Sequence, residues 1–347
     1  MSLKKIAQMA GVSPSTVSRV LNNSSTTCAS EQVKARIWKA AHELHYVPNQ
    51  SARNLKMGQA DPVQKLHILI VLARVETLDN DPFFKELYRG LEIEIFRRGF
   101  TAEILTTARD DIGCRMKGCS GMIILGRCSA KLLGTLSKYT RNLVGIWRNP
   151  MNFEIDEVVC DGKKAAQEAV EYLIKRGHRK IGYIGDCSYE SRYVGYNETM
   201  IRNQLAIDYS CIVPTGQSRE EGYQAMNRLM GDEELTAVLC ANDITAVGAL
   251  QALREHRKMK GRQISVISID NIEEAQMTTP LLTTVHIPRE AMAHMAVQIL
   301  HDRILHGHTE NLRVEFPCRI VERESCYFAE FQANAPAKPE VQDSGRG

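Results

Sequence analysis

A short polar stretch near the N-terminus carries side chains that can read the edges of nucleic-acid bases. Its polar members are Ser15, Thr16, Ser18, Arg19 and Asn22. Val17 and Leu21 lie among them at helical spacing, so a helix here would bury one face and leave the polar face to solvent or a ligand. Hydroxyl and amide groups hydrogen-bond to bases and phosphates, and the guanidinium fork of Arg19 matches guanine in the major groove. The stretch favours DNA recognition; a solvated polar face is the plain alternative.

The residues around this stretch predict a small unit of three helices. Ile6 and Ala10 belong to an apolar helix face that ends at Gly11, and Ser13 followed by Pro14 predicts the start of a second helix. The apolar residues of a third helix, capped by Ser30, are Val33, Ile37, Ala40, Ala41 and Leu44. A helix, a glycine turn and a polar-faced helix make a helix-turn-helix, whose second helix enters the major groove.

The positive charge of the chain is concentrated in the same region. The 347 residues carry a net charge of +3, but residues 1–60 hold eight Lys or Arg against two Glu, a charge of +6, which leaves −3 for the remainder. A basic segment gathers phosphate groups because it releases their counterions. The charge therefore fits a polyanion-binding head on a separate body, with a solvated basic face as the alternative.

From Leu66 onward the pattern changes to apolar runs of strand length that alternate with amphipathic helical stretches. This alternation is typical of an α/β body in which helices cover both faces of a parallel sheet. Strands are expected at 66–72, 101–105, 121–125, 143–146, 180–184, 237–240 and 264–269. Helices are expected near 83–98, 163–176, 219–230, 243–257 and 289–306. The segment 106–120 is too short and too rich in glycine for a full crossover helix.

Several kinds of chemistry are not indicated. The ten cysteines form no C-x-x-C pair and have no nearby histidine, so no metal or redox site is expected. The chain has no G-x-G-x-x-G, Walker or G-x-S-x-G motif, so we expect no cofactor and no enzyme. The chain has no apolar run near the roughly 20 residues of a membrane span, and its start lacks a secretory signal. A cytoplasmic location with reduced thiols is expected.

The sequence resembles the lactose-repressor (LacI) family from its first residues to about residue 330. The segments that carry the resemblance are 6–22, 46–55, 176–184, 241–243, 264–270 and 280–285. The short segment 106–120, the run 80–84 and Asp161 are similar to the galactoside-responsive repressors of this family.

The resemblance implies an all-α helix-turn-helix head and a two-lobed body of the periplasmic-binding-protein type with parallel sheets. The expected domains are 1–45 for DNA binding, 46–60 for a hinge helix or linker, and 61–330 for effector binding and dimerisation. The two lobes of the body would be interleaved, with crossovers near 161, 288 and 318. Residues 331–347 lack apolar periodicity and are expected to form a disordered tail.

The resemblance also implies which residues meet DNA. In the head these are Ser13, Pro14, Ser15, Thr16, Ser18, Arg19 and Asn22. In the hinge they are Tyr46, Asn49, Ala52 and Leu55. Leu55 matches the residue that the family wedges into the minor groove to kink a base step. Lys5, Pro14 and Ser15 depart from the common family pattern, so the operator sequence does not follow.

A cleft between the lobes is expected to hold a small effector. The implied effector-binding residues are Asp81, Phe83, Phe84, Asp161, Arg192, Asn242 and Asp270. In the family, Arg192 matches the effector-binding arginine, while Asn242 and Asp270 match the amide and carboxylate that bind hydroxyls. Each has a structural alternative: a phenylalanine in the core, an aspartate capping a helix, an arginine paired on the surface. Trp147 and Arg148 replace a commoner pair that contains aspartate.

The implied function is that of a homodimeric transcriptional repressor with double-stranded operator DNA as its partner. A small sugar, with a galactoside favoured, would release it from the operator of a carbohydrate-utilisation operon. A dimer is expected because the tail lacks the apolar heptads with which some relatives build tetramers. Two alternatives stay open: a corepressor-dependent regulator of the same family with a non-sugar effector, and a cytoplasmic sugar-active enzyme.

Overall fold

The computed structural model describes residues 3–21, 29–44, 66–73, 78, 81–106, 112–188, 190–260 and 263–329. The expected hinge at 46–60 and tail at 331–347 lie outside these residues. Contacts divide the chain into unit 1, which comprises Met1–Asp161 and Pro288–Pro317, and unit 2, which comprises Gly162–Ile287 and Cys318–Gly347. The chain therefore passes from one unit to the other three times.

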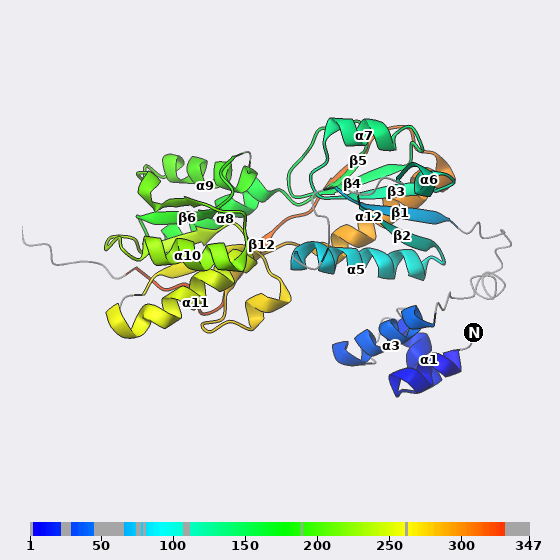
Figure 1. Ribbon diagram of the computed structural model, residues 1–347, viewed down its shortest axis with the longest axis horizontal. Helices are drawn as coiled ribbons and strands as arrows, with labels where there is room; N and C mark the ends of the chain where they lie inside the picture. The colour runs from blue at the N-terminus through cyan, green and yellow to red at the C-terminus, as the bar shows by residue number, and fades with distance from the viewer. Residues whose placement is uncertain are drawn as a thin grey trace, which may run out of the picture. The chain divides into compact units, whose positions relative to one another are not determined.

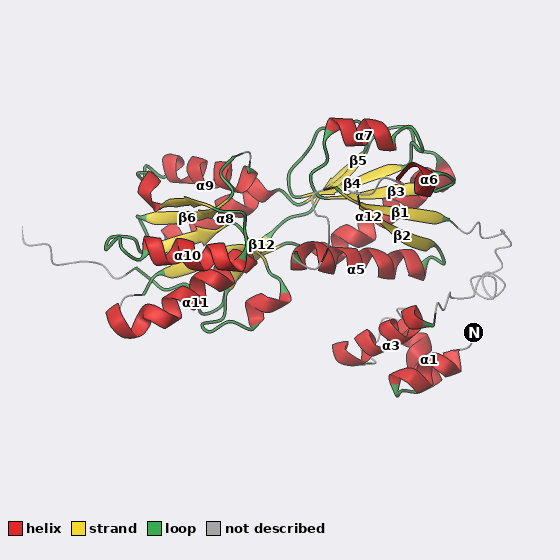
Figure 2. Ribbon diagram, in the orientation of Figure 1, coloured by secondary structure: helices red, strands yellow, loops and turns green. Residues whose placement is uncertain are grey.

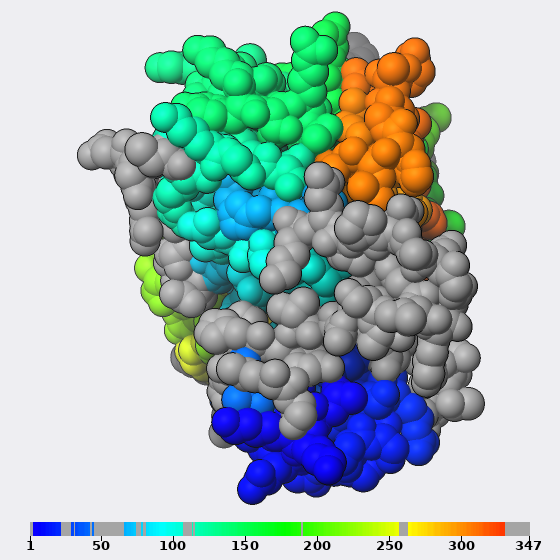
Figure 3. Space-filling view, turned by 90° about the vertical axis from the view of Figure 1, so that its right-hand side faces the viewer, coloured from blue at the N-terminus to red at the C-terminus, as the bar shows by residue number. Residues whose placement is uncertain are grey.

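Three helices form the head: α1 (Leu3–Ala10), α2 (Pro14–Leu21) and α3 (Glu31–Glu43). They confirm the predicted three-helix unit, whose residues are drawn in shades of blue in Figure 3. Their shared core consists of Ile6, Ala7, Ala10, Val17, Leu21, Ile37, Ala40 and Ala41. Gly11 ends α1 with φ at 65°, and the N–H groups of Gly11 and Val12 bond to the carbonyls of Gln8 and Ala7. A residue without Cβ adopts this left-handed conformation at little cost, so Gly11 makes the tight turn into α2.

The body of unit 1 is built on one six-stranded sheet. Its strands are β1 (His67–Leu72), β2 (Thr101–Thr106), β3 (Gly121–Leu125), β4 (Leu143–Trp147), β5 (Asp156–Val159) and β11 (Arg313–Glu315). Their order is β11-β5-β4-β3-β1-β2, and every neighbouring pair is parallel. Helices α5 (Pro82–Arg97) and α12 (Arg289–His306) pack against each other, and α6 (Ile112–Met116) and α7 (Ala130–Leu136) complete the unit (Figure 1).

Unit 2 repeats this plan with a second six-stranded sheet. Its strands are β6 (Ile181–Gly185), β7 (Ile212–Pro214), β8 (Ala237–Cys240), β9 (Ser265–Asp270), β10 (Thr283–His286) and β12 (Arg319–Val321), in the order β12-β10-β9-β8-β6-β7. All pairs are parallel except β10 with β12. Helices α8 (Gly162–Lys175) and α9 (Ser191–Arg202) pack as one pair, and α10 (Arg219–Leu229) and α11 (Asp243–Lys260) as another. Two short turns of 3-10 helix are η1 (Tyr209–Cys211) and η2 (Glu273–Gln276). Figure 2 shows strands in yellow between red helices.

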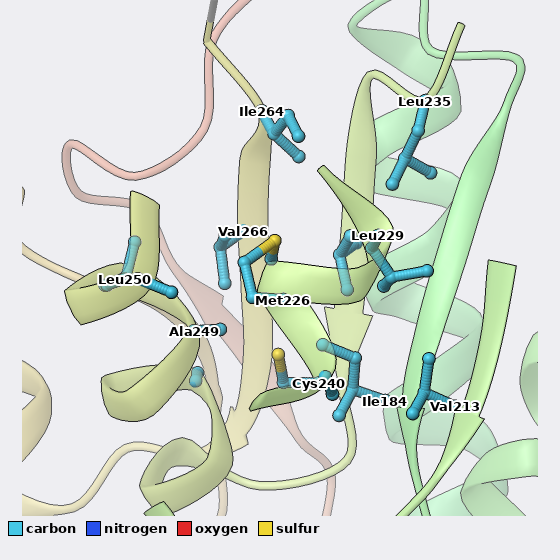
Figure 4. Close-up of a cluster of buried hydrophobic side chains, with 14 of the residues drawn as sticks. Ile184, Val213, Met226, Leu229, Leu235, Cys240, Ala249, Leu250, Ile264 and Val266 are labelled. Atoms are coloured by element: carbon cyan, nitrogen blue, oxygen red, sulfur yellow. The ribbon is translucent and has the colours of Figure 1, made fainter. Parts of the chain in front are cut away.

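One of the apolar cores of unit 2 lies between its sheet and the pair of helices α10 and α11 (Figure 4). Ile184, Cys240 and Val266 come from three neighbouring strands, and Met226 and Leu250 face them from the two helices. All five are at most 3% exposed. Close packing of this kind fixes the strands, and with them the loops at the strand ends, where ligand-binding residues of open α/β sheets are placed.

The seven predicted strands and the five predicted body helices are confirmed, with ends that shift by a few residues at most. The structure adds elements that the sequence pattern did not indicate: β5, β7, β10, β11, β12, α7 and α9. In the described part of the segment 106–120, which is expected to be too short for a full crossover helix, the one helix is the five-residue α6. Among the helices that the structure describes, none combines the length and the hydrophobicity that a membrane span requires.

Candidate functional sites

The second helix of the head presents the predicted polar face to solvent. Ser15 and Arg19 are exposed at i and i+4, while Val17 and Leu21 on the other face are 0% and 4% exposed. The helix is thus held by its apolar face and free to contact a ligand with its polar face. An exposed guanidinium fork on such a helix is the group that reads guanine from the major groove.

Ser13 stabilises the start of this helix. Its Oγ accepts a hydrogen bond from the backbone N–H of Thr16 at 3.1 Å, and it lies 2.8 Å from both the Ser15 and Thr16 hydroxyls. This is the geometry of a helix N-cap, which satisfies an otherwise unpaired backbone donor. Pro14 occupies the first helical position and is exposed. Five predicted DNA-contacting residues lie outside the described part of the chain: Asn22, Tyr46, Asn49, Ala52 and Leu55.

In unit 2, three predicted effector-binding residues lie at the carboxyl edge of one sheet. Arg192 is on α9, which follows β6; Asn242 follows β8; and Asp270 ends β9. The strand order changes direction between β6 and β8, because β7 lies on one side of β6 and β8 on the other. Ligands of open α/β sheets bind at such a switch point, outside the carboxyl ends of the strands. The structure therefore brings these three residues to one place.

Arg192 is completely buried and is paired inside the protein. Its Nε donates to Glu190 Oε1 at 2.9 Å, and its Nη2 donates to Glu190 Oε2 at 3.0 Å. Nη2 also donates to Gln217 Oε1 at 3.0 Å, and Nη1 donates to the carbonyl of Ala241 at 2.5 Å. Burial opposes the charged form of Arg192, but Glu190 outweighs burial, so the pKa of the guanidinium is raised and it stays protonated. Arg192 is thus not a surface ion pair.

Asp270 is 2% exposed and has an unusual backbone conformation. Its φ is 130°, and φ of the following Asn271 is 55°. Residues with a Cβ rarely adopt these angles, and such strain is concentrated at functional sites. The carboxylate also contributes to the attraction that keeps Arg192 charged. The role of Asp270 in effector binding stays a prediction.

Behind Asp270 lies a second buried carboxyl group, that of Asp243, which holds this edge together. Its Oδ1 accepts hydrogen bonds from the hydroxyls of Ser268 (2.5 Å) and Thr284 (2.6 Å), and its Oδ2 accepts one from the backbone N–H of Ile272 (2.8 Å). Burial raises the pKa of Asp243 to about 7, the charge of Asp270 adds to the rise, and the three hydrogen bonds oppose it. Asp243 thus ties β9 and β10 to the loop that follows Asp270.

Asn242 caps a helix and also contacts a loop residue, Gln217, that the sequence does not indicate as part of the site. Its Oδ1 accepts from the backbone N–H of Thr245 at 3.0 Å, which caps α11, and its Nδ2 donates to the carbonyl of Gln217 at 3.4 Å. Gln217 has φ at 70°, and its buried Nε2 has no hydrogen-bond partner among the described residues. Gln217 therefore joins Arg192 and Asn242. The one signal in the sequence that could have indicated Gln217 is its position in the loop just before Ser218, which starts the capping box of α10.

In unit 1, the predicted residues after β1 form an aromatic and cationic group. Asp81 caps α5 by accepting from the N–H of Phe84 at 3.2 Å. Phe83 and Phe84 are each 3% exposed, so both also serve as core residues. The guanidinium carbon of Arg148 lies 4.0 Å from the centre of the Phe83 ring, and that of Arg289 lies 5.6 Å from it. This arrangement is a cation–π stack at the carboxyl edge of the unit 1 sheet.

Asp161 follows β5, two residues after that strand ends. It is the last residue of unit 1 before the first crossover, and α8 of unit 2 starts at the next residue. Its predicted role in effector binding stays a prediction.

At the opposite, amino edge of the unit 2 sheet, acidic residues surround a lysine. Donor atoms of Asp208, Cys211 and Asp232 lie within 4.8 Å of one another. The ammonium group of Lys180 lies 2.6 Å from Asp232 and 3.2 Å from Asp208. The lysine supplies the positive charge that the carboxylates require, so this cluster is explained as a set of ion pairs.

Comparison with known proteins agrees with this geometry. The family described as "Bacterial regulatory proteins, lacI family" matches residues 2–49, and the "Periplasmic binding protein-like domain" matches residues 170–326. The HTH-type transcriptional repressor PurR of Serratia proteamaculans is 32% identical over 343 residues, which cover 93% of this chain and 96% of that protein. PurR of Pectobacterium atrosepticum is 30% identical over 340 residues, with the same coverage.

Two solved structures share the fold. A complex of the transcriptional regulator CelR with cellobiose is 25% identical, with a TM-score of 0.65, and covers 94% of this chain and 100% of its own. A LacI family transcriptional regulator from Enterococcus faecium with bound ribose is also 25% identical, with a TM-score of 0.67, and covers 76% of this chain and 100% of its own.

Proposed function

Because the chain belongs to the lacI family of bacterial regulatory proteins, we propose that it is a transcriptional repressor that a small sugar releases from its operator. The family establishes the coarser part, a DNA-binding repressor. The sugar, its binding site and the direction of its effect are the proposal. We further propose the domains 1–45, 46–60 and 61–330, a tail at 331–347, and a homodimer that binds a near-palindromic operator.

The observation that carries the DNA-binding part is the exposed polar face of α2. Arg19 and Ser15 point away from a helix whose other face is buried, in the part of the chain that holds the +6 charge. The charge supplies affinity for phosphates, and the polar face supplies base contacts. Membership of a family of regulators favours this function over that of a sugar-active enzyme.

The effector part is supported by the cluster at the carboxyl edge of the unit 2 sheet. Arg192, Asn242 and Asp270 offer N–H donors and a carboxylate, the groups that bind pairs of sugar hydroxyls. Two structural relatives hold cellobiose and ribose, which supports a sugar over other small molecules. A galactoside is the specific sugar that we propose. A corepressor of another class is the second candidate, since the curated relatives are named PurR.

The test is a gel-shift titration combined with a ligand screen. An operator would first be selected from random duplex DNA by the full chain. Galactosides, other sugars and purines would then be screened for a rise in melting temperature, because a ligand that binds only the folded state stabilises it. We expect a galactoside to raise the melting temperature and to weaken operator binding at least tenfold.

Two substitutions assign the effect to the proposed site. Asp270→Asn should abolish release of the operator by that compound. Asp208→Asn, at the amino edge of the same sheet, is the matched control and should leave release intact. A compound that strengthens operator binding would replace the inducer with a corepressor, and equal release from Asp270→Asn and wild type would contradict the site.

A further inference from the structure

Arginine binds an anion most strongly through two N–H groups on one side of its guanidinium. In Arg192, Glu190 occupies these two groups, on Nε and Nη2. The side chains of Arg192 and Glu190 are 0% and 6% exposed. Nε and Nη2 of Arg192 each donate to a different oxygen of Glu190, at 2.9 and 3.0 Å. This two-pronged contact is the same one that a guanidinium makes with a ligand carboxylate or phosphate. An anionic ligand would have to displace Glu190 to make it.

The remaining donors of Arg192 leave room for one further acceptor. A guanidinium has five N–H bonds. Two donate to Glu190, one donates to Gln217 Oε1 and one donates to the carbonyl of Ala241. One N–H of Nη1 has no acceptor among the residues that the structure describes. A single N–H can donate to a hydroxyl or carbonyl oxygen of a ligand, but it cannot make the two-pronged contact with a carboxylate or phosphate.

The charges around this N–H also disfavour an anion. Glu190 cancels the charge of Arg192, and the buried carboxylate of Asp270 lies close enough to act on the guanidinium. Asp243 lies beyond it and interacts with Asp270. Arg323 acts on Asp243 in turn, so the charges nearest the guanidinium are the two carboxylates of Glu190 and Asp270 against the one cation of Arg192. An incoming phosphate or carboxylate would meet these two negative charges after losing its hydration.

We propose, on the premise that this edge is the effector site, that Glu190 is a specificity-determining residue that restricts the site to uncharged ligands. It neutralises Arg192, fixes the one remaining N–H toward a neutral oxygen acceptor, and excludes phosphorylated or carboxylated forms of the same ligand. Glu190 thus sets the ligand class without being the group that the ligand must contact.

Inorganic phosphate tests this role without knowledge of the effector. Glu190→Gln keeps the shape of the side chain but removes the negative charge that lies directly against Arg192, so a phosphate can compete for the fork of the guanidinium. Its melting temperature should be below that of wild type and should rise with phosphate in a saturable way, at matched ionic strength. Wild type should show no such rise. We expect the apparent phosphate affinity of Glu190→Gln to exceed that of wild type at least tenfold.

Two further variants keep the result interpretable, with circular dichroism as the check on folding. Glu190→Asp retains the charge and should ignore phosphate, as wild type does. The double variant E190Q/R192Q should lose the phosphate response. Two results would overturn the proposal. One is saturable phosphate binding by wild type that the R192Q substitution removes. The other is a folded Glu190→Gln variant whose melting temperature does not respond to phosphate. A failure of the proposed function would instead show as operator binding that no neutral compound weakens, and the phosphate titration involves neither operator nor effector.

Discussion

Arg19 and Arg192 carry the same guanidinium group in opposite surroundings. Arg19 is exposed on α2, so water solvates it. Arg192 has no exposed surface and stays charged because Glu190 lies against it. The first can act by offering an open fork to a base. The second has its fork occupied, and it can act by holding Glu190, Gln217 and Ala241 in place around one remaining donor.

Replacing Arg19 by alanine should weaken operator binding and relax its sequence preference. A bidentate contact between arginine and guanine contributes about 1–3 kcal/mol of discrimination, which is roughly 5- to 150-fold in relative affinity. Gel-shift titration against the selected operator and single-base variants measures both effects. Arg19→Lys is the matched control, because it keeps the charge for phosphates but lacks the fork. It should lose discrimination while retaining more of the affinity. If Arg19→Ala bound the operator with the affinity and the sequence discrimination of wild type, Arg19 would not be a base-contacting residue.

The sequence predicts a functional residue only where the type of the residue and its position in a motif indicate a role. The resemblance to the lactose-repressor family indicates Arg192, Asn242 and Asp270 as a set, and the structure places them at one sheet edge. Glu190 and Gln217 were missed. A glutamate that pairs with an arginine two residues away, and a glutamine in a loop, resemble ordinary surface residues in sequence. Only burial and φ distinguish them, and both depend on tertiary structure.

At the scale of elements, the sequence pattern identified long apolar strands and failed for strands that carry charge. Strand β5 contains Asp156 and Glu157, which are 0% and 3% exposed. Asp156 accepts hydrogen bonds from Arg303, from His308 and from the backbone N–H of Leu312. These partners come from the far end of the chain, so hydropathy could not indicate that the carboxylate is buried. Strands β11 and β12 have three residues each, too few for a periodic signal.

The segment after β12 is tied to unit 2 by His178, which makes this attachment dependent on pH. One imidazole nitrogen lies 3.0 Å from the carbonyl of Tyr327, and the other lies 2.9 Å from the Thr236 hydroxyl. Burial lowers the pKa of His178, the hydrogen bond to the Tyr327 carbonyl opposes this, and the charges of Arg176 and Arg179 lower the pKa further, so the net shift is downward. The folded state therefore prefers the neutral ring. Its contribution to stability is present above the ordinary histidine pKa of about 6.5 and is lost as the pH falls through the lowered value.

We expect amides of the segment 322–329 to lose protection as the pH is lowered from 7.5 to 5. Hydrogen exchange measured by mass spectrometry, corrected for the intrinsic pH dependence of exchange, reports this locally. Each unit of pKa difference corresponds to about 1.4 kcal/mol, or roughly tenfold in the exchange rate. His178→Gln should remove this pH dependence. His294→Gln, at an exposed position in unit 1, is the control and should retain it. Protection that is equal at both pH values in wild type would contradict the role of His178.

At the scale of the whole molecule, charge separates the two tasks that we propose. The +6 of residues 1–60 belongs to the part that meets phosphates, and the −3 belongs to the remainder. The chain passes three times between the units, so each unit is assembled from distant segments of the sequence. A change in one unit therefore has three covalent routes to the other. Sequence motifs predict a DNA-binding head and an effector-binding body. They do not predict how these two parts are arranged when ligand or DNA binds, because that arrangement depends on contacts with the ligand and the DNA.

The proposed release of the operator requires that each ligand weakens the binding of the other by one common factor. Coupling between two sites is a single free energy, so reciprocity holds whatever the structural path. With a coupling of about 1–3 kcal/mol, saturating effector should weaken operator binding roughly 5- to 150-fold. Calorimetry of the effector with and without saturating operator should then give the same factor. Duplex DNA of scrambled sequence is the control and should change effector affinity far less. Unequal factors, at matched salt, would show that the effector acts on the operator complex by a route other than a coupled equilibrium in this chain.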